Sequence, residues 1–536
     1  MKKKILSLAL AILLLTALVP AANEPVLALS YGTNGKFVLP IDPPALGSIP
    51  ISNREDLQKI GTDKSFPLNG KYHLTADIDL SDGAWVPIGN YSTSLFGTSP
   101  FKGIFDGQGY VIRGLTIIGD NLRAGLFACA SSDAVIKNVG LEDINISING
   151  SSQTSAGAIC ADGGNISNCY STGSISVSAM GAYAGHRAFA GGICGMNGSV
   201  ENSYNSCSVS ADCTYLAYAG GISGYNSSIS SCYNTGIISA SGGSPVYAGG
   251  ICGYSNAISD CYNTGSISAS SRGENSYAGG ISGVNIKDGS ISNCYNTGVV
   301  YGSSPSSKVS YVGGLCGYSQ DGAVIRSSYW NIDSRVEDGL GYGIGQATAL
   351  TSEQMKQQSS YSGWDFTTVW GFKPGVNDGY PVLRAFYEFP SAWAEAAVYE
   401  AIEKDILPAS LQNNYTKPCT RAEFCALAVA LIEQATGKEI TERATFKDTD
   451  DINVRKIGGM EIVYGVGDDN FNPDGNISRQ EAAIILERLA RKGLDKQLPE
   501  GEANFSDLHL ILISNKNYPN NPIPPGNAHN AGRIIF

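Results

Sequence analysis

A five-residue pattern, Gly-Gly-Ile-Cys/Ser-Gly, recurs along the middle of this 536-residue chain. It occupies residues 191–195, 220–224, 249–253 and 279–283, with Gly-Gly-Leu-Cys-Gly at residues 313–317. Successive copies are separated by 29, 29, 30 and 34 positions, counted between their third residues, Ile193, Ile222, Ile251, Ile281 and Leu315. Weaker copies precede them at residues 124–127 and 156–160. A fixed period of this length is typical of a solenoid, whose repeats bury their apolar residues only by stacking on one another.

The residues between the copies have the pattern of strands and turns. A second motif, Cys-Tyr-Asn-Thr-Gly, follows in phase at residues 232–236, 261–265 and 294–298. Short runs such as Ile175-Ser176-Val177 alternate apolar and polar residues, which is the period of a β-strand. Gly pairs and Asn-Thr-Gly supply the turns. We therefore expect a mainly β chain that forms a parallel β-solenoid, with one coil per repeat and a rise of about 4.8 Å per coil.

Residues 124–330 resemble the GLUG repeats of bacterial surface proteins, and the resemblance implies the same stacked β-helix. The flanks fit this context, because residues 74–80, 85–89 and 101–107 look like the start of such solenoids, and residues 362–366 and 377–381 look like their finish. A bare solenoid end exposes strand edges that invite aggregation, so capping segments are expected. We assign residues 31–123 to an N-terminal cap with the first coils and residues 331–387 to a C-terminal cap.

Most of the thirteen cysteines fall at two positions of the repeat. One position holds Cys160, Cys194, Cys252 and Cys316, with Ser223 and Ser282 in other repeats, and the second holds Cys169, Cys232, Cys261 and Cys294. In an exported chain these residues could form disulfides, and an odd count leaves at least one cysteine unpaired. Interchange with Ser favours the other interpretation, a stacked internal row of small side chains with free, buried thiols.

Composition and the N-terminus indicate an exported protein. Charged residues make up 16% of the chain and the net charge is −12, which argues against a basic nucleic-acid-binding protein. Residues 1–30 have the pattern of a signal peptide, with lysines at residues 2–4, an apolar run at residues 5–19 and small residues beyond it. The apolar run is short for a membrane span, and no second long run occurs. We expect a secreted protein with no transmembrane segment.

A different motif, outside the repeats, occurs twice near the C-terminus. It reads Thr-Arg-Ala-Glu at residues 420–423 and Ser-Arg-Gln-Glu at residues 478–481. Each copy precedes an apolar run, which predicts a helix that begins with a capping box. The arginines do not serve that purpose, because a cation at the first helical position faces the positive end of the helix dipole. Arg421 and Arg479 therefore point to another role, such as binding a carboxylate, while two solvated surface arginines are the alternative.

The sequence around these motifs resembles the S-layer homology (SLH) modules of bacterial surface proteins, which implies a small all-α domain after the solenoid. The first module is expected at residues 388–440, with Ser-Ala-Trp-Ala at residues 391–394 opening its first helix. The second is expected at residues 444–495, from Phe446-Lys447-Asp448 through a loop at residues 465–473. A third begins at Phe505-Ser506-Asp507 and remains incomplete through residue 536.

Modules of this family bind secondary cell wall polysaccharide, often carrying ketal-linked pyruvate, in grooves between neighbouring modules. The resemblance implies that an acidic wall polysaccharide, pyruvylated or otherwise, contacts Trp393, Arg421, Asp448 and Arg479. Packing in the helix core is the other explanation for Trp393. The protein is accordingly expected at the cell wall or S-layer surface of a bacterium. Family members usually carry three modules, so two complete modules are expected to hold the polymer less tightly.

The sequence contains no recognisable catalytic motif. The four histidines, His73, His186, His509 and His529, form no His-Glu-x-x-His zinc motif. The acids of the repeats fall at different phases, and turns explain Asp79 and Asp106. No cofactor, metal or nucleic acid is expected.

Three hypotheses remain for the function. The favoured one is a non-enzymatic, wall-anchored surface protein that displays a β-solenoid stalk. The second is a carbohydrate-active lyase or hydrolase that uses the β-helix. The third is an adhesin whose Tyr233, Tyr262 and Tyr295 bind an external glycan, although the fixed phase of these residues favours a structural ladder.

Overall fold

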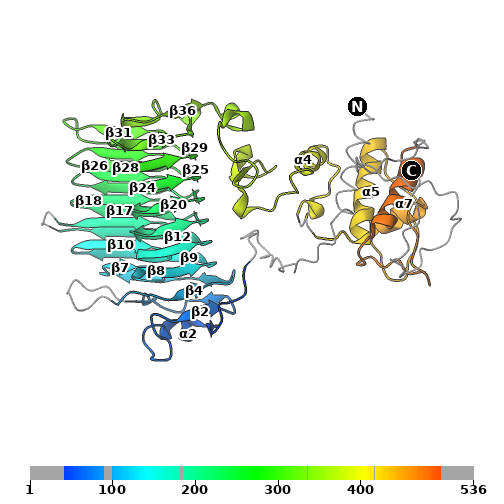
Figure 1. The fold of residues 1–536 in the computed structure, drawn as a ribbon, viewed down its shortest axis with the longest axis horizontal. Helices are drawn as coiled ribbons and strands as arrows, with labels where there is room; N and C mark the ends of the chain where they lie inside the picture. The colour runs from blue at the N-terminus through cyan, green and yellow to red at the C-terminus, as the bar shows by residue number, and fades with distance from the viewer. Residues whose placement is uncertain are drawn as a thin grey trace. The chain divides into compact units, whose positions relative to one another are not determined.

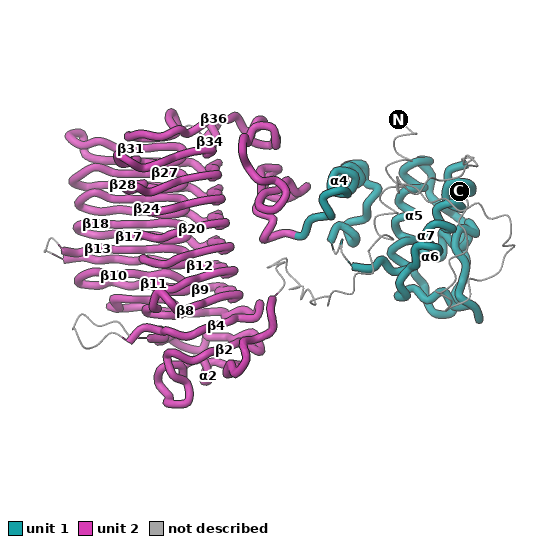
Figure 2. Tube along the Cα trace, viewed as in Figure 1, with its two compact units in different colours: residues 1–25, 388–536 teal, residues 26–387 magenta. Residues whose placement is uncertain are grey.

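The computed structural model describes residues 41–89, 99–181, 185–334, 336–413, 415 and 417–495. They fall into two compact units, which meet in sequence between Tyr387 and Glu388 (Figure 2). The signal peptide expected at residues 1–30 and the third module expected at residues 503–536 lie outside the described residues. Within the described ranges, no helix has both the length and the apolar character needed to cross a membrane.

The larger unit, drawn in magenta in Figure 2, is a parallel β-solenoid of about eight turns, which confirms the expected mainly β architecture (Figure 1). Its strands stack into three parallel sheets. Sheet 1 contains β1 (Ile49–Ile51), β2 (Lys71–Leu74), β4 (Ile104–Asp106), β8 (Ala130–Lys137), β11 (Cys160–Ser167), β14 (Cys194–Met196), β15 (Ser199–Glu201), β19 (Ser223–Tyr225), β20 (Ser228–Ser230), β24 (Cys252–Ser259), β28 (Ser282–Ser292), β32 (Cys316–Ser319), β33 (Val324–Arg326) and β35 (Leu340–Gly343).

The other two sheets complete each coil. Sheet 2 contains β7 (Arg123–Ala124), β10 (Gln153–Gly157), β13 (Arg187–Gly191), β18 (Leu216–Gly220), β23 (Val246–Gly249), β27 (Ser276–Gly279) and β31 (Ser310–Gly313). Sheet 3 contains β3 (Ile78–Asp79), β5 (Val111–Arg113), β6 (Thr116–Gly119), β9 (Gly140–Gly150), β12 (Tyr170–Ala179), β16 (Tyr204–Asn205), β17 (Ser208–Cys213), β21 (Tyr233–Asn234), β22 (Ile238–Gly242), β25 (Tyr262–Asn263), β26 (Ile267–Ser271), β29 (Tyr295–Asn296), β30 (Val300–Ser303), β34 (Ser328–Asn331) and β36 (Ala347–Leu350). The short helix α2 (Arg54–Lys59) lies near the N-terminal end.

The Gly-Gly-Ile motif forms the corner between sheets 2 and 1. Its isoleucines stack in a fully buried row, and Ile222 N–H donates to the Ile251 carbonyl of the next coil at 2.9 Å. Burial of one such side chain contributes about 1.5–3 kcal/mol. The glycines are required because the chain passes very close to itself here. A Cβ on Gly220 would lie 1.9 Å from the carbonyl oxygen of Ser223, and one on Gly221 would lie 2.1 Å from that of Gly250.

The Tyr-Asn-Thr-Gly motif builds a buried ladder of asparagine amides. The Nδ2 group of each donates to Oδ1 of the next, at 2.7, 2.7 and 2.8 Å along Asn205, Asn234, Asn263 and Asn296. Each amide also donates to the carbonyl two residues on, as Asn234 does to Gly236 at 2.9 Å. Because buried amides are costly without partners, this network explains why Asn recurs at this position.

All thirteen cysteines are buried and free. The first row runs in register from Cys160 and Cys194 through Ser223, Cys252 and Ser282 to Cys316, as the interchange predicted. At the second position Ser203 and Ser328 also belong to the row, and the sequence analysis did not include these two serines. There the sulfur or hydroxyl accepts a backbone N–H from the preceding coil, as Ser203 does from Cys169 at 3.0 Å and Cys261 does from Cys232 at 3.4 Å.

The motif tyrosines stack outside sheet 3, where a later segment covers them. Ring centroids of Tyr204, Tyr233, Tyr262 and Tyr295 are 4.8, 4.8 and 5.1 Å apart along the ladder. Residues 351–387, which include α3 (Ser352–Met355) and the antiparallel pair β37 (Trp370–Gly371) and β38 (Val382–Leu383), lie along the side of the solenoid and pack aromatic rings over this ladder (Figure 1). Tyr233, Tyr262 and Tyr295 are therefore buried, and the hypothesis that they bind an external glycan is wrong.

The other unit, drawn in teal in Figure 2, contains a small helical domain. It contains α4 (Glu395–Glu403), α5 (Arg421–Thr436), α6 (Ile452–Gly459) and α7 (Arg479–Arg488), and α7 continues into a wider turn at residues 489–493. One apolar cluster joins these helices, with Phe424, Leu431, Ile457 and Leu489 fully buried. The unit therefore has a core of its own, separate from the solenoid.

Candidate functional site

Both predicted capping boxes are present at the starts of α5 and α7. Thr420 Oγ1 accepts the Glu423 N–H at 3.2 Å, and the Glu423 carboxylate accepts the Thr420 N–H at 2.7 Å. Ser478 and Glu481 repeat this exchange at 3.2 and 2.9 Å. Each box satisfies backbone donors that the first turn of a helix leaves without partners.

Arg421 is buried within the helical unit. It is 7% exposed, and its guanidinium donates to the carbonyls of Phe471 and Tyr464, both at 3.0 Å. Nη1 donates to Oε1 of Glu481 at 2.6 Å, and the guanidinium carbon lies 4.6 Å from the centre of the Phe471 ring. The expectation that folding does not explain this arginine is wrong, because its side chain holds the loop that precedes α7.

The two copies of the motif are joined to each other. Glu481 closes its own capping box through Oε2 and accepts Arg421 of the other copy through Oε1. The backbone makes the same connection, since Arg421 N–H donates to the Gly475 carbonyl at 2.9 Å and Ala422 N–H donates to that of Pro473 at 3.0 Å. These are first-turn donors of α5, so the loop that precedes α7 completes the start of α5.

Arg479 occupies the matching position of the second copy but is exposed. The structure thus separates two residues that the sequence treats alike. Arg421 lies under the loop that precedes α7, whereas Arg479 presents its side chain at the surface of the described helical unit.

Asp448 organises the same loop. Its two carboxylate oxygens accept the N–H groups of Phe471 and Asn472, both at 2.7 Å. Burial works to raise the pKa of Asp448, but these two hydrogen bonds outweigh it and hold the pKa below its ordinary value. Asp448 is therefore an ionised support for the same loop that Arg421 contacts.

Trp393 is 64% exposed and lies in the turn before α4, which begins at Glu395 rather than at Ser391. The core-packing alternative for Trp393 is therefore wrong. A large aromatic side chain left at the surface is available to contact a ligand.

A small pocket opens beside the Arg421 guanidinium. Its wall includes Tyr464, Glu481, Ile485 and Arg488, and the Arg488 guanidinium lies 4.7 Å from the centre of the Tyr464 ring. The volume of 20 Å³ accommodates about one water molecule, so a sugar ring does not fit as the pocket stands. Two guanidinium groups, one carboxylate and apolar side chains make it suited to a small anionic group. Sequence reasoning missed Tyr464 and Arg488, which belong to no repeated motif.

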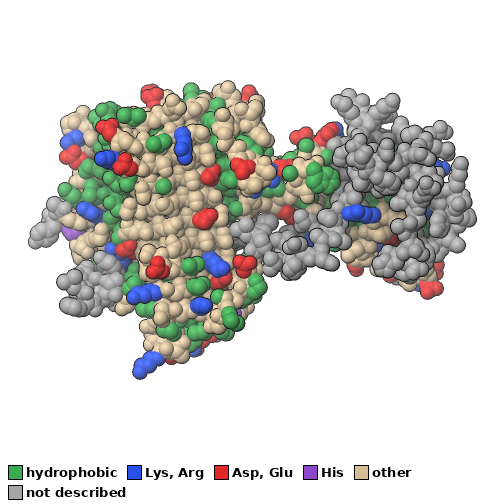
Figure 3. Space-filling model, viewed as in Figure 1, with side chains coloured by type: hydrophobic (Ala, Val, Ile, Leu, Met, Phe, Trp, Pro, Cys, Tyr) green, Lys and Arg blue, Asp and Glu red, His purple; other side chains and the backbone are tan. Residues whose placement is uncertain are grey.

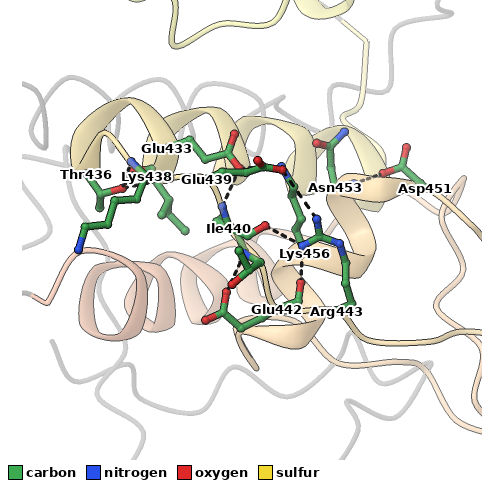
Figure 4. Close-up of polar contacts among 12 residues, drawn as sticks. Glu433, Thr436, Lys438, Glu439, Ile440, Glu442, Arg443, Asp451, Asn453 and Lys456 are labelled. Atoms are coloured by element: carbon green, nitrogen blue, oxygen red, sulfur yellow. Dashed lines mark hydrogen bonds and ion pairs between the residues drawn. The ribbon is translucent and has the colours of Figure 1, made fainter.

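A wider polar groove of about 600 Å³ lies at the other end of α5. Figure 4 shows Glu433, Glu439 and Lys456 directed toward one another there, with Lys456 Nζ 2.7 Å from Glu433 and 3.4 Å from Glu439. Burial works to raise the pKa of Glu433, but hydrogen bonds from Lys456 and from Ile440 N–H outweigh it and hold the pKa below its ordinary value. No pattern in the sequence marks this cluster.

The acids considered for catalysis in the solenoid have structural partners. Asp106 is buried beside Lys137 at 3.2 Å and accepts Asn138 Nδ2 at 2.9 Å, whereas exposed Asp79 accepts Ser81 N–H at 2.8 Å. Among the residues that the structure describes, no group of three or more His, Cys, Asp or Glu side chains could hold a metal ion.

Comparison with known proteins identifies an S-layer homology domain at residues 453–483. No curated protein matches the chain. A solved structure, a "putative immunoglobulin A1 protease from Bacteroides ovatus", is similar over 64% of this chain and 93% of its own, with 22% identity and a TM-score of 0.41. A score this low does not establish a common fold. The SLH domain indicates non-covalent anchoring at the cell wall, and hence a cell-surface protein.

Proposed function

We propose that the helical unit binds an acidic secondary cell wall polysaccharide and thereby displays the solenoid as a non-enzymatic stalk on the bacterial surface. The observation that carries the proposal is the SLH domain at residues 453–483, which lies in a unit with its own core. The solenoid supports the proposed role as a stalk, because its GLUG-like repeats form a long stack held by internal ladders.

The side chains of the helical unit fall into two groups, those that contact the polymer and those that position the loop. Exposed Arg479 and Trp393 are the contacts for the polymer, one for an acidic group such as a ketal-linked carboxylate and one for the sugar ring. Arg421 and Asp448 are positioning residues, because both hold the loop at residues 463–473 through hydrogen bonds to its backbone. The pocket beside Arg421 and Arg488 is a second place where a small anionic group would find guanidinium donors.

A cell-wall pull-down tests the proposal. The intact chain should sediment with purified walls, and Arg479→Ala should reduce the bound fraction several-fold without changing the unfolding temperature. Arg326→Ala, which removes an exposed arginine from the solenoid, is the matched control and should bind normally. Equal retention of wild type and Arg479→Ala would refute the role of Arg479, and absence of the wild-type chain from the pellet would refute wall binding.

A further inference from the structure

The solenoid carries a second set of stacked tyrosines that no motif in the sequence analysis covers. One row lies on sheet 2, where Phe189, Tyr218, Tyr247, Tyr277 and Tyr311 pair in register on successive strands. A neighbouring row on sheet 1 runs in register from Tyr225 and Tyr254 through buried Val284 to Tyr318 and Tyr342. We call the two rows together the tyrosine face.

The tyrosine face points outward. In β18, Ala217 and Ala219 are fully buried on either side of Tyr218, so the alternation of the strand directs the ring away from the core. The face opens toward the C-terminal coils, since Phe189 and Tyr218 are buried, Tyr247, Tyr277 and Tyr311 are half-buried, and Tyr342 is 61% exposed.

On sheet 3 the comparable row of stacked tyrosines is covered by aromatic side chains of a later segment of the chain. There the Phe386 ring stands nearly perpendicular on Tyr233, with centroids 4.9 Å apart. On the tyrosine face, the apolar cluster within the described residues contains only side chains of the solenoid coils themselves. Partly exposed aromatic side chains on adjoining coils are a composition typical of interaction sites.

The distance between successive rings indicates which class of polymer fits the tyrosine face. Centroids along the first row are 5.0, 4.8, 5.1 and 5.0 Å apart, so the face repeats once per coil. A peptide strand repeats its side chains on one face every 6.6–6.8 Å or so, and the stacked nucleotides of a duplex follow one another at about 3.4 Å, so both lose register within a few coils. An extended β-linked polysaccharide advances by nearly the same distance per sugar as the solenoid does per coil.

The chemistry of the face agrees with that geometry. The rows present phenol hydroxyls and ring edges, and neither row contains a charged residue. Figure 3 shows a solenoid surface on which charged side chains are scattered and most of the area is uncharged. With a net charge of −12, the protein repels polyanions unless a local cation intervenes. We propose that the tyrosine face binds a neutral, extended β-linked polysaccharide along the solenoid axis, one sugar per coil.

Affinity electrophoresis of the full chain in gels that contain hydroxyethyl cellulose, a soluble β-1,4-glucan, tests this proposal. Wild type should be retarded, whereas α-linked dextran and polygalacturonate should have no effect. Tyr247→Ala/Tyr277→Ala should weaken retardation by about tenfold. Tyr301→Ala, which removes a tyrosine that is 60% exposed on sheet 3, should not change it.

The outcomes separate this site from the wall anchor. Arg479→Ala should leave retardation unchanged, because the anchor lies in the other unit. If the double alanine variant fails to fold, Tyr254→Phe/Tyr318→Phe removes only two hydroxyls and should still weaken binding. No retardation of wild type in the cellulose gel, retardation only by dextran or polygalacturonate, or full retardation of a folded double variant would overturn the proposal.

Discussion

Replacement of Arg421 by alanine distinguishes a structural arginine from a ligand-binding one. The structure predicts that Arg421→Ala destabilises the helical unit, because the side chain donates to two backbone carbonyls and to Glu481 from a position that is 7% exposed. Its loss would leave two carbonyls without these donors and a carboxylate without its cation.

The expected magnitude follows from that geometry. Both side chains of the Arg421–Glu481 pair are largely buried, at 7% and 16% exposure, so solvent screens the interaction little. Removal of one partner from a buried ion pair costs about 3–5 kcal/mol. The capping bonds from Ser478 remain and still support Glu481, which places the estimate toward about 3 kcal/mol. Arg479→Ala, at an exposed position, should change the free energy of unfolding by less than about 0.5 kcal/mol.

Urea unfolding followed by circular dichroism at the helical wavelengths measures this difference, because the helical signal comes mainly from the helical unit. Arg421→Lys should recover only part of the stability, since an ammonium cannot reproduce the planar fork of donors. A folded Arg421→Ala protein within about 1 kcal/mol of wild type, yet unable to bind cell walls, would refute the structural role and restore Arg421 as a ligand contact.

Three further predictions concern the ladders and the effect of pH. Asn263→Ala should lower the stability of the solenoid by about 1–3 kcal/mol in calorimetry, because Asn234 loses its acceptor, and should leave the helical transition unchanged. Burial raises the pKa of the Cys194 and Cys252 thiols to about 12, so folded protein at neutral pH should react slowly with a thiol reagent while denatured protein shows thirteen free thiols; four or more disulfides would contradict this. The folded-state pKa of Glu433 lies below its ordinary 4.5, so its contribution to stability is present above pH 4.5 and is lost as pH falls through the lower folded value. Glu433→Gln should therefore reduce the loss of unfolding free energy that acid causes in this range.

The solenoid could be predicted because each element of its pattern has a local cause. The period of 29 or 30 residues is one coil, and the glycines are required where backbones nearly touch. The Cys–Ser exchange of the first row marks a buried position whose thiol or hydroxyl donates to the carbonyl two residues on, as in Cys194 and Ser282. The covered tyrosine ladder and the tyrosine face could not be distinguished from sequence. Their rings share the same repeat, and only the return of residues 351–387 along one side decides which row is covered by another segment of the chain.

The helical unit shows the same limit at the level of single residues. Local rules identified both capping boxes, because a hydroxyl and a glutamate three residues apart act within one helical turn. The different surroundings of Arg421 and Arg479 depend on which loop packs over each helix start, a long-range contact that the repeated motif does not encode. For Trp393 the sequence suggested a place on the apolar face of a helix and hence burial. The helix begins only at Glu395, so Trp393 lies outside it and is exposed.

The most direct test of the anchoring account compares binding of the intact chain to walls before and after chemical removal of their acidic secondary polysaccharide. The account predicts co-sedimentation with complete walls, loss of binding to stripped walls and competition by the released polymer, with Arg479→Ala impaired throughout. Undiminished binding to stripped walls, or failure of the released polymer to compete, would contradict it.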